Sequence, residues 1–140
     1  MKKILLIGCG HMGSALLTSW LDSKKYHITI IDPLKYKTLK KKFSNKHIKL
    51  INNFSMLDKL ASYYFVIFAT KPIDLNQALV NFSSINLDKK TNIISVVAGK
   101  KIEKQKPDFS KNKKYSKDKR KYGDSPIFLE KIRCFLFIFL

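Results

Sequence analysis

Apolar and polar residues alternate in blocks along the first hundred residues, and these blocks predict strands and helices in turn. Short apolar runs predict five strands, at residues 3–7, 27–31, 48–51, 63–69 and 92–97. The fourth of these runs is apolar without interruption, which is typical of a strand buried on both faces of a parallel sheet.

The segments between the strands carry helical patterns. The helix after the first strand would place five residues on its buried face: Met12, Ala15, Leu16, Ser19 and Trp20. Residues 34–43 and 55–61 predict two further helices, the first of them rich in lysine. The helix after the fourth strand has its apolar residues at the same spacing: Leu75, Ala78, Leu79 and Phe82. Because strands and helices alternate with short connections, residues 1–103 are predicted to form one α/β domain with a Rossmann-like, doubly wound parallel sheet.

The turn after the first strand reads G-C-G-H-M-G over residues 8–13, and an acidic residue, Asp32, follows the second strand. Between a strand and a helix, a G-x-G-x-x-G sequence predicts a dinucleotide-binding unit. Gly8 would permit the tight turn, Gly10 would let a pyrophosphate approach the backbone, and Gly13 would let the helix pack closely on the strand. The helix N-terminus would offer free N–H groups to the phosphates, and Asp32 would accept hydrogen bonds from a ribose. The alternatives are a glycine-rich turn without a ligand, and an Asp32 that only caps a turn or a helix.

Ligands of such sheets bind at the carboxyl ends of the strands, near the point where the strand order reverses. Gly8, Asp32, residues 70–72 and residues 98–99 all follow predicted strands and would meet at this edge. Lys71 stands between a buried strand and a proline, which favours a place in the site over a solvated surface position. One edge of the sheet therefore carries the predicted site.

The net charge is +18, and it comes from lysine rather than arginine, at 26 residues against two. Recognition of phosphates and bases favours the planar guanidinium of arginine. The charge therefore indicates lysines on solvated faces and argues against nucleic acid as a partner. The alternative is a non-catalytic basic scaffold that uses the dinucleotide fold to bind a protein or nucleic acid.

The two cysteines and three histidines are dispersed along the chain, which predicts neither a disulfide nor a metal site. The apolar run before Gly8 is shorter than a signal peptide needs. No segment reaches the roughly 20 apolar residues that span a bilayer. These features predict a cytoplasmic protein that contacts no membrane.

The pattern changes at about residue 104. Residues 104–123 are rich in lysine and show neither helical nor strand periodicity, which is typical of disordered chain. Residues 127–140 end in an apolar run that would form either a buried strand or a segment prone to aggregation. We therefore separate a domain at residues 1–103 from a poorly structured tail at residues 104–140, which reads as an out-of-frame or decayed remnant.

Three motifs in register resemble the N-terminal domain of the pyrroline-5-carboxylate reductases. The glycine loop of that family reads G-x-G-N-M-G-x-A-L, and residues 8–16 read G-C-G-H-M-G-S-A-L. After the fourth strand the family has A-V-K-P, where residues 69–72 read A-T-K-P. After the fifth strand it has S-x-x-A-G, where residues 95–99 read S-V-V-A-G. The resemblance covers residues 1–103 and implies a domain that binds NAD(H) or NADP(H) for reduction of the C=N bond of pyrroline-5-carboxylate, in proline biosynthesis.

The resemblance also implies which residues contact the nicotinamide dinucleotide. Residues 7–12 would line the pyrophosphate, residues 69–72 would lie along the nicotinamide ribose, and residues 95–98 would lie near the nicotinamide. With Gly13 and the acidic residue of the glycine motif included, the predicted cofactor-binding residues are Ile7, Gly8, Gly10, His11, Met12, Gly13, Asp32, Ala69, Thr70, Lys71, Pro72, Ser95 and Ala98.

The chain departs from the family pattern in three places. His11 stands where the family usually has asparagine, and Asp32 stands where many members have a polar or basic residue. The carboxylate at position 32 favours NAD(H), because it would repel the 2′-phosphate of NADP(H). The family's Met-Pro-Asn-Thr-Pro segment and the helical domain that builds its dimer and substrate pocket have no counterpart here. We therefore expect a truncated form, with no catalytic residue of its own and no meaningful reductase activity alone.

Overall fold

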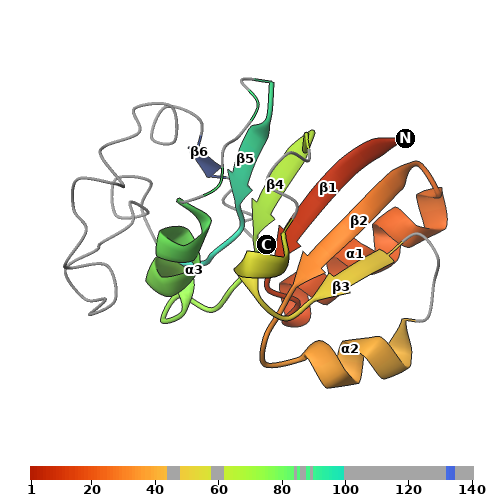
Figure 1. The fold of residues 1–140 in the computed structure, drawn as a ribbon, viewed down its shortest axis with the longest axis horizontal. Helices are drawn as coiled ribbons and strands as arrows, with labels where there is room; N and C mark the ends of the chain where they lie inside the picture. Colours follow the sequence, from red (N-terminus) through yellow and green to blue (C-terminus); the bar gives the residue numbers. More distant parts are fainter. Residues whose placement is uncertain are drawn as a thin grey trace.

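The computed structural model describes residues 1–43, 48–57, 62–83, 85, 88 and 90–99, together with the backbone of Ile132–Cys134. Its six strands are β1 (Lys2–Ile7), β2 (Tyr26–Ile31), β3 (Ile48–Ile51), β4 (Phe65–Phe68), β5 (Asn92–Ser95) and β6 (Ile132–Cys134). They form one sheet in the order β3-β2-β1-β4-β5-β6, and every neighbouring pair is parallel (Figure 1). The predicted Rossmann-like parallel sheet is confirmed.

The helices are α1 (His11–Ser23), α2 (Tyr36–Lys42) and α3 (Leu75–Phe82), with one 3-10 turn, η1 (Phe54–Met56). Helix α2 begins two residues later than predicted, because the backbone N–H of Lys35 is bonded to the Asp32 carboxylate in a turn that precedes the helix. Of the helix predicted at residues 55–61, residues 55–56 belong to the 3-10 turn η1, which ends before Leu57, and residues 58–61 lie outside the described residues.

Helices cover both faces of the sheet. The four apolar residues predicted for α3 are all buried, in a cluster that includes Leu5 and Ile7 of β1. In this cluster the rings of Phe68 and Phe82 meet edge to face, with centroids 5.4 Å apart. Helices α1 and α2 pack on a second cluster, which contains the alternate β1 residues Ile4 and Leu6. The sheet is therefore doubly wound, as its crossovers require.

The buried face of α1 agrees with the predicted one in part, because Leu16 and Trp20 pack against the second cluster. Gly13 and Leu17 are buried, whereas Ala15 and Ser19 are exposed and Trp20 is half-buried against the cluster. Gly13, described below, is the residue at which this helix approaches the glycine loop closely enough to exclude a Cβ. Helical spacing predicted the existence of this helix, whereas its most buried residues, Gly13 and Leu17, lie outside the predicted set.

Strand β6 is the part of the tail that the structure describes, and it pairs in parallel with β5, Ile94 opposite Arg133. The rest of the tail predicted at residues 104–140 lies outside the described residues. Among the helices that are described, none is both long enough and apolar enough to cross a membrane.

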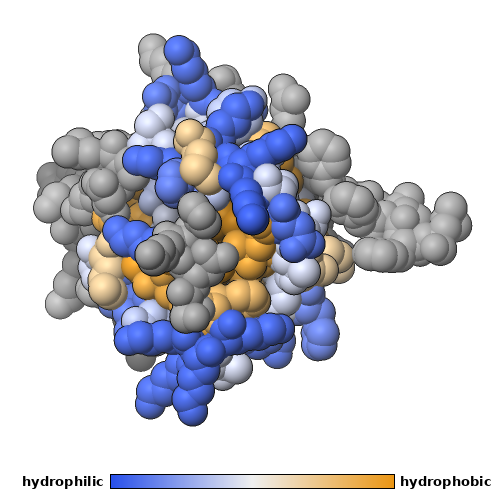
Figure 2. All heavy atoms as spheres, turned by 90° about the vertical axis from the view of Figure 1, so that its right-hand side faces the viewer, coloured by the Kyte–Doolittle hydropathy of each residue, from blue (hydrophilic) through white to orange (hydrophobic). Residues whose placement is uncertain are grey.

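In the described part of the chain, the positively charged side chains lie on the surface. Every lysine in the described part of the chain is exposed, including Lys40, Lys41 and Lys42 in the last turn of α2. Figure 2 shows one face of the molecule, on which hydrophilic side chains surround a smaller apolar area. This distribution agrees with the prediction that the lysines lie on solvated faces of the domain.

Candidate functional site

The candidate site lies where the chain changes direction across the sheet. From β1 the chain continues to β2 and β3 on one side, then returns to β4 and β5 on the other side. At the carboxyl end of β1, the backbone N–H of Gly8 donates to the carbonyl of Ile31 at 2.8 Å, at the end of β2. The N–H of Ala69 donates to the carbonyl of Ile7, also at 2.8 Å. The glycine loop is thus held between the ends of β2 and β4, at the position where such sheets bind ligands.

Two glycines of the loop are required by the fold itself. Gly8 has φ +88°, a conformation that side chains disfavour, and a Cβ there would lie 2.8 Å from the carbonyl oxygen of Ala69. A Cβ on Gly13 would lie 2.5 Å from the carbonyl oxygen of Gly8. These two residues allow the loop to touch β4 and the helix to touch the loop, as the sequence predicts.

Gly10 is different. Its φ is −71°, which any residue can adopt, and a Cβ on it would meet no described atom within 4 Å. Neither backbone strain nor crowding therefore explains a glycine here. Gly10 is also the N-cap of α1, which has no side-chain cap and no acidic residue in its first turn. The space beside Gly10 therefore borders the unpaired N–H groups and the positive dipole end of a helix, a combination suited to a phosphate.

Asp32 fastens the glycine loop to the end of β2. Its Oδ2 accepts the backbone N–H of Cys9 at 2.8 Å, and its Oδ1 accepts the N–H of Lys35 at 2.9 Å. The turn-capping role that the sequence left open is therefore present. A carboxylate offers about four lone-pair positions, so two of them remain for ribose hydroxyls. The side chain is partly exposed.

Cys9 is part of the glycine loop, and its side chain is fully buried in the second cluster, on which α1 and α2 pack. Burial raises the pKa of its thiol, and the hydroxyl of Ser14, 3.5 Å from Sγ, opposes this rise. Ser14 also donates to the Cys9 carbonyl at 3.2 Å. No role for Ser14 was predicted from the sequence, although a hydroxyl directly after the third glycine is a signal for such a contact with the loop.

The loop after β4 contributes two kinds of residue. Ala69 is buried, whereas Lys71 and Pro72 are exposed at the edge. The hydroxyl oxygen of Thr70 is shielded from solvent, and it has no hydrogen-bond partner in the part of the chain that is described. The Cα of Thr70 lies so close to the glycine loop that a Cβ on Gly8 would be 2.9 Å away from it.

The remaining predicted cofactor-binding residues differ in how far they are exposed. Ser95 is 2% exposed, and its Oγ accepts the N–H of Val97 at 3.4 Å, so its side chain supports the turn after β5. Ala98 and His11 are exposed, Met12 is partly exposed, and the side chain of Ile7 is in the core. The edge thus brings together Gly8, Gly10, Asp32 and Thr70, and it holds Ser95 as a supporting residue.

Two exposed apolar side chains at this edge were missed by the sequence analysis. Leu34 is 86% exposed in the loop after β2, and Ile73 is 85% exposed in the loop after β4. Each directly follows a proline and precedes a helix. A large apolar residue between a proline and a helix, outside the apolar spacing of that helix, was the signal in the sequence for an exposed apolar side chain.

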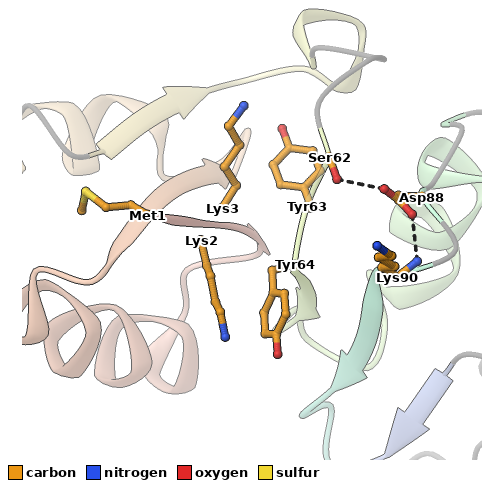
Figure 3. Close-up of a pocket in the computed structure, with 8 residues that line it drawn as sticks. All are labelled: Met1, Lys2, Lys3, Ser62, Tyr63, Tyr64, Asp88 and Lys90. Atoms are coloured by element: carbon orange, nitrogen blue, oxygen red, sulfur yellow. Dashed lines mark hydrogen bonds between the residues drawn. The ribbon is translucent and has the colours of Figure 1, made fainter.

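A cavity of about 290 Å³ lies at the opposite, amino-terminal edge of the sheet (Figure 3). The ammonium of Lys2 lies over the ring of Tyr64, 3.9 Å from its centroid, and Ser62 donates to Asp88 at 3.2 Å. None of the predicted cofactor-binding residues lines it. It is therefore separate from the glycine-loop site.

Comparison with known proteins agrees with this geometry. Residues 3–99 match the family described as NADP oxidoreductase, coenzyme F420-dependent. No curated protein matches the chain.

Three solved structures show the extent of the likeness. Prephenate dehydrogenase from A. aeolicus is 19% identical with a TM-score of 0.57, over 70% of this chain and 34% of that chain. A D-mandelate dehydrogenase is 21% identical with a TM-score of 0.58, over 74% of this chain and 36% of that chain. The 1-pyrroline-5-carboxylate reductase of Streptococcus pyogenes is 20% identical with a TM-score of 0.53, also over 74% and 36%.

The matched region thus covers about a third of the length of each of these enzymes. At such identities the likeness shows a common fold, whereas the family match rests on the sequence from the first strand to Gly99. The chain belongs to the family of the NADP oxidoreductase, coenzyme F420-dependent.

Proposed function

We propose that this domain binds NAD(H) along the carboxyl edge of the sheet, across the ends of β2, β1 and β4. The adenosine ribose would bond to Asp32, the pyrophosphate would lie beside Gly10, and the nicotinamide half would extend toward Thr70. The cofactor supplies the hydride, and the residues of this chain hold and orient it.

The open space beside Gly10 is the main support for this proposal. The fold explains Gly8 and Gly13 by close contacts, but it leaves the space beside Gly10 open. A glycine is useful there if a ligand takes the volume that a side chain would fill. The uncapped N-terminus of α1 beside it supplies N–H donors for an anion, which supports a pyrophosphate as that ligand.

The choice between NAD(H) and NADP(H) rests on Asp32. The family description names NADP, yet a 2′-phosphate would meet a carboxylate that is already held in place by two backbone N–H groups. Repulsion between two anions at a partly exposed site disfavours NADP(H). We therefore propose NAD(H) as the preferred cofactor of this chain.

Calorimetric titration of the protein with NADH, NADPH and a single-stranded RNA tests this function. We expect micromolar binding of NADH, weaker binding of NADPH, and little RNA binding at physiological salt. Equal or tighter binding of NADPH would contradict the preference. RNA binding with a steep salt dependence and no NADH binding would favour the basic-scaffold alternative instead.

We further propose that the domain serves a reductase of the pyrroline-5-carboxylate type. The solved structures do not single out this enzyme, because the TM-scores of the other two dehydrogenases are as high. The support comes from the two loop motifs, A-T-K-P at residues 69–72 and S-V-V-A-G at residues 95–99, which follow β4 and β5 at the candidate edge.

A domain exchange tests this finer assignment. Residues 1–99 of this chain would replace the matching domain of the Streptococcus pyogenes reductase, and NADH oxidation would be followed with pyrroline-5-carboxylate. We expect activity in this chimera and its loss when Gly10→Val is added. A chimera that folds and binds NADH but does not reduce pyrroline-5-carboxylate would contradict the assignment.

A further inference from the structure

Ser14, in the first turn of α1, bonds to the backbone of the glycine loop. Its hydroxyl donates to the carbonyl oxygen of Cys9 at 3.2 Å, and the same hydroxyl oxygen lies 3.5 Å from the Cys9 thiol. The backbone N–H of Cys9 donates to Asp32 at 2.8 Å. Both backbone polar groups of Cys9 are therefore held by side chains from outside the loop.

The bond from Ser14 also fixes the direction of the next N–H group. In a trans peptide, the carbonyl and the N–H that follows it point in opposite directions. Because the Cys9 carbonyl is turned to Ser14, the Gly10 N–H points away from Ser14, and it donates to no atom in the part of the chain that is described. A reversed peptide would place a carbonyl oxygen where this donor now lies.

Gly10 does not by itself hold this peptide in one orientation. Reversal of the peptide would carry φ of Gly10 from −71° to a positive value, and glycine adopts positive φ about as readily as negative φ. The residue whose missing side chain leaves open space is thus also the residue that lets the peptide reverse. A reversed carbonyl oxygen would repel a phosphate, because both carry negative charge. The bond from Ser14 selects the orientation that keeps this oxygen away.

We propose that Ser14 is a positioning residue, whose hydroxyl holds the Cys9–Gly10 peptide so that its N–H, and not its carbonyl oxygen, faces the pyrophosphate of the dinucleotide. Ser14 acts through this peptide and does not bind the ligand itself. The inference rests on the proposed NAD(H) function, and it adds a residue that determines how tightly the phosphates are held.

The test compares the unaltered full chain with Ser14→Ala and Ser14→Thr in titrations with NADH, ADP and adenosine. Ser14→Ala removes the hydroxyl and should weaken the binding of NADH and of ADP by the same factor, about 2- to 10-fold. Adenosine, titrated at millimolar concentration, has no phosphate and should bind equally well to each protein. Ser14→Thr keeps a hydroxyl on the same Cβ and should retain the affinity for all three ligands.

Two further variants act as controls. Thr18 lies one turn further along α1, and its hydroxyl donates to the Ser14 carbonyl at 3.0 Å. Thr18→Ala therefore loses a comparable bond from a hydroxyl to the backbone and should change none of the three affinities. Ser14→Val has the shape of Ser14→Thr without the hydroxyl, so it should show the loss expected for Ser14→Ala even if that variant fails to fold. Thermal melts verify that each protein is folded.

Unchanged affinity for NADH and ADP in a folded variant without the hydroxyl would overturn the inference. An equal loss of adenosine binding, or a loss in Ser14→Thr as large as in Ser14→Val, would also overturn it, because Ser14 would then only support the fold. Failure of the unaltered protein to bind NADH and ADP would instead overturn the proposed function on which the inference rests.

Discussion

The carboxylate of Asp32 accepts a hydrogen bond from the backbone N–H of Cys9, at 2.8 Å and across 23 residues of sequence. The side chain proposed to bind the ribose thus also fixes the loop proposed to bind the pyrophosphate. Its other oxygen fixes the turn before α2 through Lys35. Cofactor preference and loop geometry therefore depend on one carboxylate, and substitutions of it should affect both in separable ways.

Asp32→Asn should change the cofactor preference and lower the free energy of unfolding by less than Asp32→Ala does, because the amide keeps one acceptor for the two backbone N–H groups that the carboxylate binds. The amide keeps one oxygen acceptor but loses the charge that repels a 2′-phosphate, so the ratio of NADH to NADPH affinity should fall by about tenfold or more. Asp32→Ala removes both acceptors and should lower the free energy of unfolding by about 1–3 kcal/mol, because it leaves backbone N–H groups unpaired. Titrations and denaturant unfolding measure the two effects. An unaltered affinity ratio in Asp32→Asn would show that the carboxylate does not face the ribose.

Leu34 and Ile73 should contribute to binding and not to folding. Both are almost fully exposed, so truncation removes little buried surface, and the free energy of unfolding should change by less than about 0.5 kcal/mol. If they offer apolar surface to the flat rings of the dinucleotide, Leu34→Ser and Ile73→Ser should each weaken NADH binding about 2- to 10-fold. If both variants bind NADH with the affinity of the unaltered chain, these side chains do not contribute to binding.

The thiol of Cys9 should make stability depend on pH in the alkaline range. Its pKa is raised in the folded protein by burial, above the value of about 8.5 in an unfolded chain. The folded state therefore holds the proton more tightly, and this contribution is complete below about pH 8.5 and is lost as pH rises through the folded-state pKa. Unfolding in a Cys134→Ser background, with and without Cys9→Ala, measures it. The two proteins should differ in the alkaline slope, and identical slopes would refute the effect.

The fold of residues 1–99 could be predicted from the sequence because local patterns and global topology agree there. The spacing of Leu75, Ala78, Leu79 and Phe82 predicted a buried face, and all four residues are buried. The run around β4 predicted a strand covered on both faces, and Val66 and Phe68 pack in one cluster while Ile67 packs in the other. The local pattern of apolar residues, a helical period for α3 and a continuous run for β4, was sufficient for these elements.

Other features depend on contacts between distant residues, which one sequence does not reveal. Gly13 of α1 lies against the carbonyl of Gly8, and Ala15 and Ser19 lie on the exposed side despite their spacing. The start of α2 is set by a hydrogen bond from Lys35 to Asp32. The sequence predicted that Asp32 lies at the candidate site, but its bond to the glycine loop appears only in three dimensions.

The contrast between Gly10 and Gly13 gives the most direct test of the central claim, that this edge is built to hold a dinucleotide. Gly13→Ala places a Cβ against the Gly8 carbonyl oxygen and should lower the free energy of unfolding by about 1–3 kcal/mol. Gly10→Ala meets no described atom and should change it by less than about 1 kcal/mol.

The deciding measurement is the NADH affinity of Gly10→Ala, taken beside its free energy of unfolding. We expect an affinity at least tenfold weaker in a protein that is as stable as the unaltered chain, because the methyl group occupies the place of the pyrophosphate. An equally stable Gly10→Ala protein that binds NADH as tightly as the unaltered chain would contradict it.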